Sequence, residues 1–213
     1  MAHLKTDIKF PDVEKANSDG VLAIGGDLSP ERLLVAYQNG IFPWFEANDP
    51  IIWWAPNPRM VLFLDELKIS KSMRNVLNKN NFRVTYNQNF REVISNCQQI
   101  NRNGQIGTWI TNEMLEAYCN LHTLGHAKSI EVWENDTLVG GLYGVDLGRI
   151  FCGESMFSKV SNASKIAFVY LVNNLITKDY ILLDCQVYNS HLESLGAREI
   201  ERKDFMAILK SNL

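Results

Sequence analysis

The chain has 213 residues, of which 46% are hydrophobic and 21% charged, a composition that suits a globular protein with one main core. No apolar stretch approaches the ~18 residues that a membrane span needs, and the N-terminus lacks the apolar run of a signal peptide, so we expect a cytoplasmic protein rather than a membrane or secreted one. The net charge of −3 argues against a general polyanion binder, and four widely spaced cysteines without a C-x-x-C pair favour reduced thiols over disulfides or zinc.

Residues 1–58 are rich in glycine, proline and tryptophan, and we expect them to form a small, loop-rich N-terminal domain. Within it, Ser29 suits the N-cap of a helix that Gly40 would end. Two aromatic segments follow, at 41–45 and 51–54, with prolines in and around them.

From residue 59 to residue 213 the periodicity is that of a regular α/β domain. The predicted strands are 61–63, 82–86, 129–133, 137–145, 149–157 and 180–187, the predicted helices are 70–79, 89–100, 111–125, 162–177 and 190–195, and a last strand and helix complete the chain. The three strands from residue 129 read as an antiparallel meander. This order of elements resembles that of the N-acetyltransferase-like (GNAT) acyltransferase fold, so the expected fold class is α/β (α+β), with a GNAT-like domain after the small N-terminal one.

Two strand segments that read as buried, 151–157 and 182–187, carry polar groups that a plain core would exclude. Because side chains alternate along a strand, Asp184 and Gln186 share one face, and Glu154 converges with them if the two strands are neighbours. An unpaired buried carboxylate costs several kcal/mol, so such groups usually mark a site. The alternative is that Asp184 is a satisfied structural acid, bonded to nearby backbone or capping the next helix.

Other reactive residue types favour structural interpretations. Cys185 lies on the strand face opposite Asp184, and no histidine stands nearby in sequence to act as its base, so a small buried hydrophobe is the better interpretation. His122 and His126 have the spacing of a metal-binding helix face, but Gly125 lies between them and no third ligand is evident. We therefore expect no metal site.

The tryptophans divide between core and binding roles. Trp53 and Trp54 are interpreted as core residues that hold the N-terminal domain to the main one. Trp44 lies in a proline-braced turn and is interpreted as a stacking platform for a nucleobase, and Trp109, just before a helix, is expected to line the same cleft.

A stretch without acidic residues, 67–91, carries six basic ones, among them Lys71, Arg74, Lys79 and Arg83. A local basic stripe on an acidic protein favours contact with nucleic-acid phosphates. A solvated helix face is the alternative, and charge alone does not separate the two.

The junction 158–165 lacks the glycine-rich pattern with which coenzyme-A-dependent members of the GNAT fold hold a pyrophosphate. It still offers a helix N-terminus with the polar residues Ser161, Asn162, Ser164 and Lys165. We expect these groups to suit the 3′ end of an RNA.

Several segments resemble the motifs of a known family, the leucyl/phenylalanyl-tRNA–protein transferases. They follow the family's order across nearly the whole chain: GGDLSP at 25–30, GIFPWF at 40–45, WWAPNPR at 53–59, GTWIT at 107–111, GHA at 125–127, SIEVW at 129–133, FCGESMF at 151–157 and DCQ at 184–186. Jointly, these motifs are highly specific.

The resemblance implies an enzyme that moves Leu, Phe or Met from an aminoacyl-tRNA to the N-terminal Arg or Lys of an acceptor protein. That tag would mark the acceptor for degradation by the N-end rule, and the reaction needs neither a cofactor nor a metal. The alternatives are a coenzyme-A-dependent N-acyltransferase of the GNAT fold and a tRNA-binding module without activity.

With this chemistry in view, the hypothesis assigns catalytic roles to three residues: Asp184 orients Gln186 and draws proton density, Gln186 accepts from the attacking amine, and Glu154 holds the cationic acceptor terminus. The predicted substrate-binding residues are Trp44, Trp109, Phe151, Gly153, Met156, Phe168 and Asn189. The predicted tRNA-binding residues are Lys71, Arg74, Lys79 and Arg83.

Overall fold

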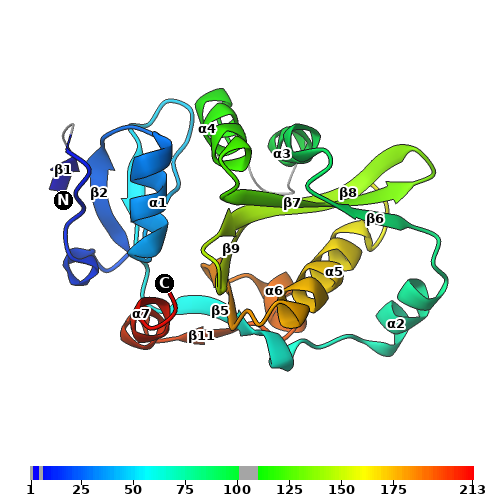
Figure 1. Ribbon diagram of the computed structural model, residues 1–213. Coiled ribbons are helices and arrows are strands. Elements are labelled where there is room, and N and C mark those ends of the chain that lie inside the picture. The colour runs from blue at the N-terminus through cyan, green and yellow to red at the C-terminus, as the bar shows by residue number, and fades with distance from the viewer. Residues whose placement is uncertain (1, 5–6, 101–109) are drawn as a thin grey trace.

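The computed structural model describes residues 2–4, 7–100 and 110–213, whose strands form two sheets with helices packed around them (Figure 1). The expected mixed α/β fold class is confirmed: antiparallel strands, a helix and a parallel strand follow one another in the main sheet in the predicted order. Within the described ranges, no helix is long and apolar enough to cross a membrane. All four cysteines are free and buried.

The N-terminal part, expected to be rich in loops, has a sheet of its own. Its strand order is β1-β2-β4-β3, with β1 parallel to β2 and the other pairs antiparallel. The strands are β1 (Ala2–Leu4), β2 (Val21–Gly25), β3 (Phe42–Pro43) and β4 (Ile52–Trp54), and helix α1 (Pro30–Gln38) lies beside them. These strands are two to five residues long, too short for an alternating pattern to show in the sequence.

The main sheet has seven strands in the order β11-β5-β10-β9-β8-β7-β6. Only β9 and β10 run parallel, and every other neighbouring pair in this sheet is antiparallel. The strands are β5 (Arg59–Phe63), β6 (Arg83–Tyr86), β7 (Ala127–Glu134), β8 (Thr137–Asp146), β9 (Ile150–Ser158), β10 (Leu182–Gln186) and β11 (Arg198–Ile200).

Helices cover both faces of this sheet. Figure 1 shows α3 and α4 on one face and α5 and α6 on the other, with α2 beyond α5 and α7 beside β11. Their bounds are α2 (Lys71–Asn78), α3 (Phe90–Gln99), α4 (Asn112–Thr123), α5 (Ala163–Thr177), α6 (Ser190–Ser194) and α7 (Arg202–Lys210). The caps follow the sequence: the Ser70 hydroxyl accepts from the Met73 amide at the start of α2, and the Thr111 hydroxyl accepts from the Met114 amide at the start of α4.

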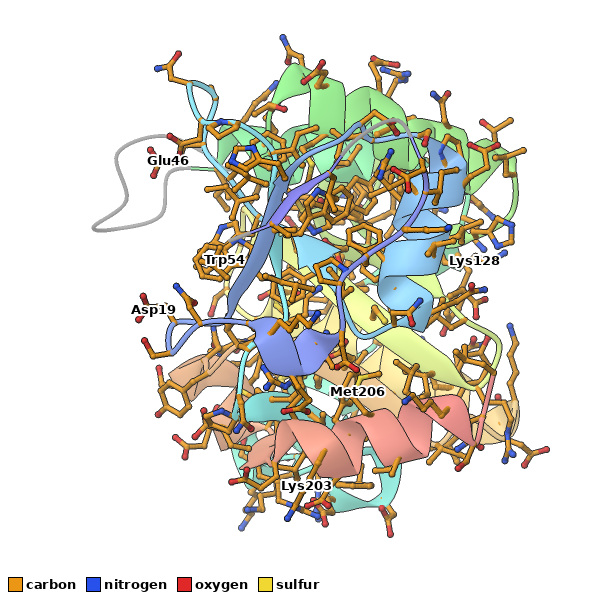
Figure 2. The ribbon with its side chains drawn as sticks, turned by 90° about the vertical axis from the view of Figure 1, so that its left-hand side faces the viewer. Asp19, Glu46, Trp54, Lys128, Lys203 and Met206 are labelled. Atoms are coloured by element: carbon orange, nitrogen blue, oxygen red, sulfur yellow. The ribbon has the colours of Figure 1, made fainter. Side chains whose placement is uncertain are left out.

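One hydrophobic core joins the N-terminal sheet to the main sheet. Leu33 of α1 and Trp53 of β4 belong to the same buried cluster as Phe90 of α3 and Tyr143 of β8. Figure 2 views the N-terminal elements with α7 beneath them, and Met206 of α7 belongs to that cluster too. The predicted domain boundary at residue 58 stays a prediction, because one buried cluster contains residues from both sides of it.

The pairing of β9 with β10 ends early, and this opening positions the site. The last paired residues are Asp184 and Cys152, so beyond them the two strands separate. On its other edge β9 has a bulge against β8, where Glu154 is the extra residue, and β10 has an irregularity against β5 between Asp184 and Gln186. Both polar segments identified in the sequence therefore leave regular sheet geometry at the same end of the sheet.

Trp53 is the residue on which the shared core should depend most. Its side chain is fully buried, its indole N–H donates to the Gly25 carbonyl over 2.8 Å, and the Phe10 ring meets it edge-on at a centroid distance of 4.8 Å. We expect Trp53→Ala to lower the free energy of unfolding by about 3–5 kcal/mol, measured by urea denaturation. Trp54→Ala, at the partly exposed neighbouring position, serves as the control and should cost clearly less; equal losses would contradict this role for Trp53.

Candidate active site

A cavity of about 440 Å³ lies where β9 and β10 separate. Its wall is apolar toward α5, where Met156 of β9, Phe168 of α5 and Leu183 of β10 line it. The opposite wall carries the polar side chains of Glu154 and Gln186. The cavity thus joins an apolar hole to a small polar cluster, at the place where regular strand pairing stops.

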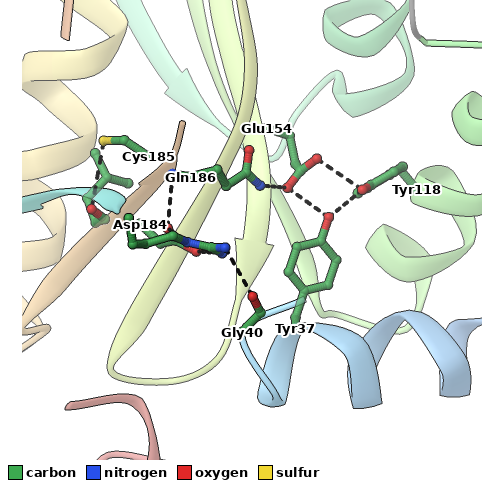
Figure 3. Close-up of polar contacts among 9 residues, drawn as sticks. Tyr37, Gly40, Tyr118, Glu154, Asp184, Cys185 and Gln186 are labelled. Carbon is green, nitrogen blue, oxygen red and sulfur yellow. Dashed lines mark hydrogen bonds and ion pairs between the residues drawn. The ribbon is translucent and has the colours of Figure 1, made fainter. Parts of the chain in front are cut away.

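Glu154 is held by three neutral hydrogen-bond donors (Figure 3). The Tyr37 hydroxyl and the Gln186 side-chain amide each donate to Glu154 Oε1 over 2.7 Å, and the Tyr118 hydroxyl donates to Oε2 over 3.0 Å. The hydroxyls of Tyr37 and Tyr118 are also within hydrogen-bond distance of each other, and because two phenols carry only two protons for these three contacts, all three are hydrogen bonds only when the Glu154 carboxyl is itself protonated. Because Gln186 donates its N–H₂ to Glu154, its amide orientation is set, and its carbonyl oxygen is left as an acceptor at the cavity wall.

The surroundings of Glu154 move its ionisation into the physiological range. Burial raises the pKa of Glu154 to about 7, although the hydrogen bonds from Tyr37, Tyr118 and Gln186 oppose that rise. Burial also raises the pKa of both tyrosines well above the usual value, so they remain neutral donors. A carboxyl group with a pKa near 7 can exchange a proton at neutral pH.

Asp184 is the second acid of the cluster, and it is fully partnered. Arg59 donates to it twice, from Nε to Oδ1 over 2.8 Å and from Nη2 to Oδ2 over 2.7 Å, and both side chains are buried. Asp184 Oδ1 also accepts from the backbone N–H of Gln186 over 3.0 Å. Asp184 lies behind Gln186 and is not part of the cavity wall.

Gln186 has an unusual backbone. Its φ of +66° lies in the left-handed region that residues other than glycine seldom adopt. Such conformations persist only where the surrounding contacts hold them, and they are common at functional sites.

Five of the predicted substrate-binding residues line the cavity: Trp44, Gly153, Met156, Phe168 and Asn189. Trp44 is 36% exposed, and its backbone carbonyl accepts from the Trp54 indole over 2.6 Å. Asn189 also caps α6, because its side-chain oxygen accepts from the backbone N–H groups of His191 and Leu192.

Two members of that set are placed differently or not at all. Phe151 is only 2% exposed and does not line the cavity, because its ring packs over Gly144 in the same buried cluster as Leu183 and Phe168. Its expected place in the cavity wall is therefore not found. Trp109 lies outside the described residues.

The predicted tRNA-binding side chains of Lys71, Arg74, Lys79 and Arg83 are all exposed, on and just after α2 and at the start of β6. The Arg83 guanidinium lies 5.0 Å from the centre of the Trp133 ring. In the described chain, none of the four forms an ion pair with an acidic residue. The polar groups at 161–165 do not line the cavity.

Sequence reasoning missed three residues of this cluster. Tyr37 and Tyr118 lie on apolar faces of α1 and α4, and Arg59 begins β5. The signal in the sequence was a tyrosine at a core position of each helix. A buried tyrosine hydroxyl needs a hydrogen-bond partner, and a buried carboxyl group is a suitable one. His191, in the first turn of α6, also lines the cavity.

Comparisons with known proteins match nearly the whole chain to one family. The family model described as leucyl/phenylalanyl-tRNA protein transferase matches residues 61–210, and the model for the N-terminal domain of that family matches residues 26–57. A leucyl/phenylalanyl-tRNA–protein transferase from Flavobacterium johnsoniae is 69% identical over 99% of this chain and 100% of its own length. One from Flavobacterium psychrophilum is 64% identical, with the same coverage of both chains.

Among solved structures, L-PGS from Bacillus licheniformis is similar with 12% identity and a TM-score of 0.44, over 79% of this chain and 54% of that one. The family matches cover most of the described chain, including β9, β10, β5 from Val61 onward, and the N-terminal segment that contributes Tyr37 and Trp44. The chain belongs to the leucyl/phenylalanyl-tRNA–protein transferase family.

Proposed function

We propose that this protein transfers Leu, Phe or Met from an aminoacyl-tRNA to the N-terminal Arg or Lys of an acceptor protein, in the cytoplasm, and so marks that protein for N-end-rule degradation. The observation that carries the proposal is the cavity itself, which joins an apolar hole to the Gln186 amide and the Glu154 carboxyl. The family membership of the chain supports the same reaction.

The apolar end suits the donor side chain. Met156, Phe168 and Leu183 surround it, and a cavity of about 440 Å³ has room for a Leu, Phe or Met side chain beside the end of the tRNA. An apolar pocket rejects charged side chains but separates near-isosteres by only about 1–3 kcal/mol, which fits a donor range of these three amino acids. Trp44 at the cavity wall would then support the terminal adenosine.

The polar end suits the attack of an amine on an ester. The nitrogen of the acceptor's α-amine bonds to the ester carbonyl carbon, the bond from that carbon to the ribose oxygen breaks, and one proton passes from the nitrogen to the ribose oxygen. Gln186 accepts a hydrogen bond from the amine and aims its lone pair. Once the amine is neutral, the Glu154 carboxylate, whose pKa is near 7, takes the proton that the attacking nitrogen loses and passes it to the leaving ribose oxygen.

The direct test is to incubate the protein with Phe-tRNA and a peptide that begins with Arg. We expect mass spectrometry to show a peptide extended by Phe at its N-terminus. The same peptide with an acetylated N-terminus should stay unchanged, because it lacks the nucleophile. Acylation from acetyl-coenzyme A instead of Phe-tRNA would contradict the proposal and favour the coenzyme-A-dependent reaction.

A second expectation concerns pH. Transfer should need both the neutral amine, whose pKa is about 7.7–8.0, and the carboxylate of Glu154, whose pKa is about 7. Because both groups must lose a proton, the logarithm of the single-turnover rate should rise with a slope of about two per pH unit below pH 7.

Glu154→Gln isolates this contribution. The variant should react much more slowly, and its rate should rise with a slope of about one, since only the amine still titrates. An unchanged slope in Glu154→Gln would remove Glu154 from the proton transfer. Phe-tRNA binding, measured in parallel, should be unaffected by the substitution.

A third expectation concerns tRNA binding. Lys71→Glu combined with Arg74→Glu should weaken binding of aminoacyl-tRNA and reduce the slope of log K against log salt concentration by about one to two, because fewer counterions are released. Charge reversal at Lys203 and Lys210 of α7, which are equally exposed on another part of the surface, is the matched control and should leave the slope unchanged. The same loss in both double variants would contradict a local role for α2.

A further inference from the structure

Arg59 is a charged side chain in the interior whose contacts reach both parts of the candidate site. It is 1% exposed and stands at the start of β5, next to the strand that carries Asp184 and Gln186. The guanidinium lies 4.9 Å from the centre of the Phe42 ring and 4.7 Å from that of the Phe205 ring. A guanidinium held between two rings, with its donors directed at fixed acceptors, has little freedom to move.

One side of this guanidinium holds the strand that carries Gln186. Two of its nitrogens donate to the two carboxylate oxygens of Asp184. Asp184 Oδ1 in turn accepts from the backbone N–H of Gln186, whose φ of +66° needs such support. The Gln186 side chain leaves that backbone toward Glu154.

The other side of the guanidinium holds the N-terminal segment. Arg59 Nη1 donates to the Gly40 carbonyl over 3.0 Å. Gly40 lies between Tyr37, which donates to Glu154, and Trp44, which lines the cavity. A Cβ at Gly40 would come within 2.6 Å of the Met206 sulfur, so the chain is closely fitted at this point.

The geometry points to Arg59 as a positioning residue for aminoacyl transfer: it sets the Gln186 backbone through Asp184 and the Tyr37–Trp44 segment through the Gly40 carbonyl. This inference rests on the proposed function. It also changes the role of Asp184, which acts through position, because a bidentate guanidinium neutralises its charge and it has no access to the cavity. The amine's proton then goes to Glu154 and not to Asp184.

The first test is Arg59→Lys, which keeps the charge but cannot reach two carboxylate oxygens and a carbonyl together. We expect kcat for Phe transfer to fall about 100-fold, the usual cost of a misplaced reacting group, while KM for Phe-tRNA stays near the wild-type value. The matched control is Arg198→Lys, because Arg198 also pairs with an acid, Glu66, and lies 4.6 Å from a ring centre, at Phe63, but on the surface. A wild-type kcat in Arg59→Lys would overturn the inference.

The second test separates position from charge. The double variant Arg59→Gln with Asp184→Asn removes both charges but keeps an oxygen at 184 to accept from Gln186 and an amide at 59 to donate. We expect its kcat to exceed that of Asp184→Ala by at least about tenfold, with the pH profile of the wild type. A folded double variant as slow as Asp184→Ala would mean that Asp184 acts by its charge, and would overturn the inference. If the double variant does not fold, as judged by circular dichroism, Arg59→Lys decides by its kcat.

A third measurement does not need activity. In ¹⁵N-labelled protein, the side-chain amide signal of Gln186 should shift as Glu154 titrates, because the two are hydrogen-bonded. We expect Arg59→Lys to abolish that shift and Arg198→Lys to keep it; a preserved shift in Arg59→Lys would overturn the inference. If the wild-type protein transfers no Phe, the proposed function fails, and this signal still tests the positioning role.

Discussion

The early end of the pairing between β9 and β10 is the constraint on which the site depends. Two parallel strands that stay paired would fill the space beyond Cys152 and Asp184 with their own backbone and side chains. Because they separate, helix α5 and the segment around Trp44 close the gap from two sides and leave a cavity. The bulge at Glu154 and the left-handed backbone of Gln186 then direct both polar side chains into the space that the strands have vacated.

The two acids of the site are stabilised in opposite ways, and this difference divides their chemistry. Asp184 has a bidentate arginine and a backbone donor, so its charge is fully compensated inside the protein. Glu154 has only neutral donors, two phenols and an amide, so burial keeps its pKa near 7. Asp184, paired with a cation, holds the structure around it, whereas Glu154, which has no cation beside it, is ready to gain or lose a proton near neutral pH.

Much of the architecture could be predicted from the sequence, because its elements are long and regularly patterned. The meander and helix α5 followed from periodicity, and Glu154 and Gln186 were found as polar residues in apolar strands. What periodicity cannot show is which side chains of a strand meet the cavity and which pack beneath it, and this is why Phe151 was expected in the cavity although it is buried in the core beside Leu183. Tyr37 and Arg59 were missed for a related reason: their partners are more than a hundred residues away along the chain.

The shared core explains why a segment as small as the N-terminal one is part of the site. Tyr37 and Trp44 reach Glu154 and the cavity only if α1 is fixed against the main sheet. That attachment is made by apolar packing around Trp53, which is strong but not directional, and by directional hydrogen bonds, from Arg59 to the Gly40 carbonyl and from Tyr37 to Glu154. Packing brings the two sheets together, and these hydrogen bonds fix their relative position. Catalytic geometry in this protein is therefore a property of the junction between its two sheets.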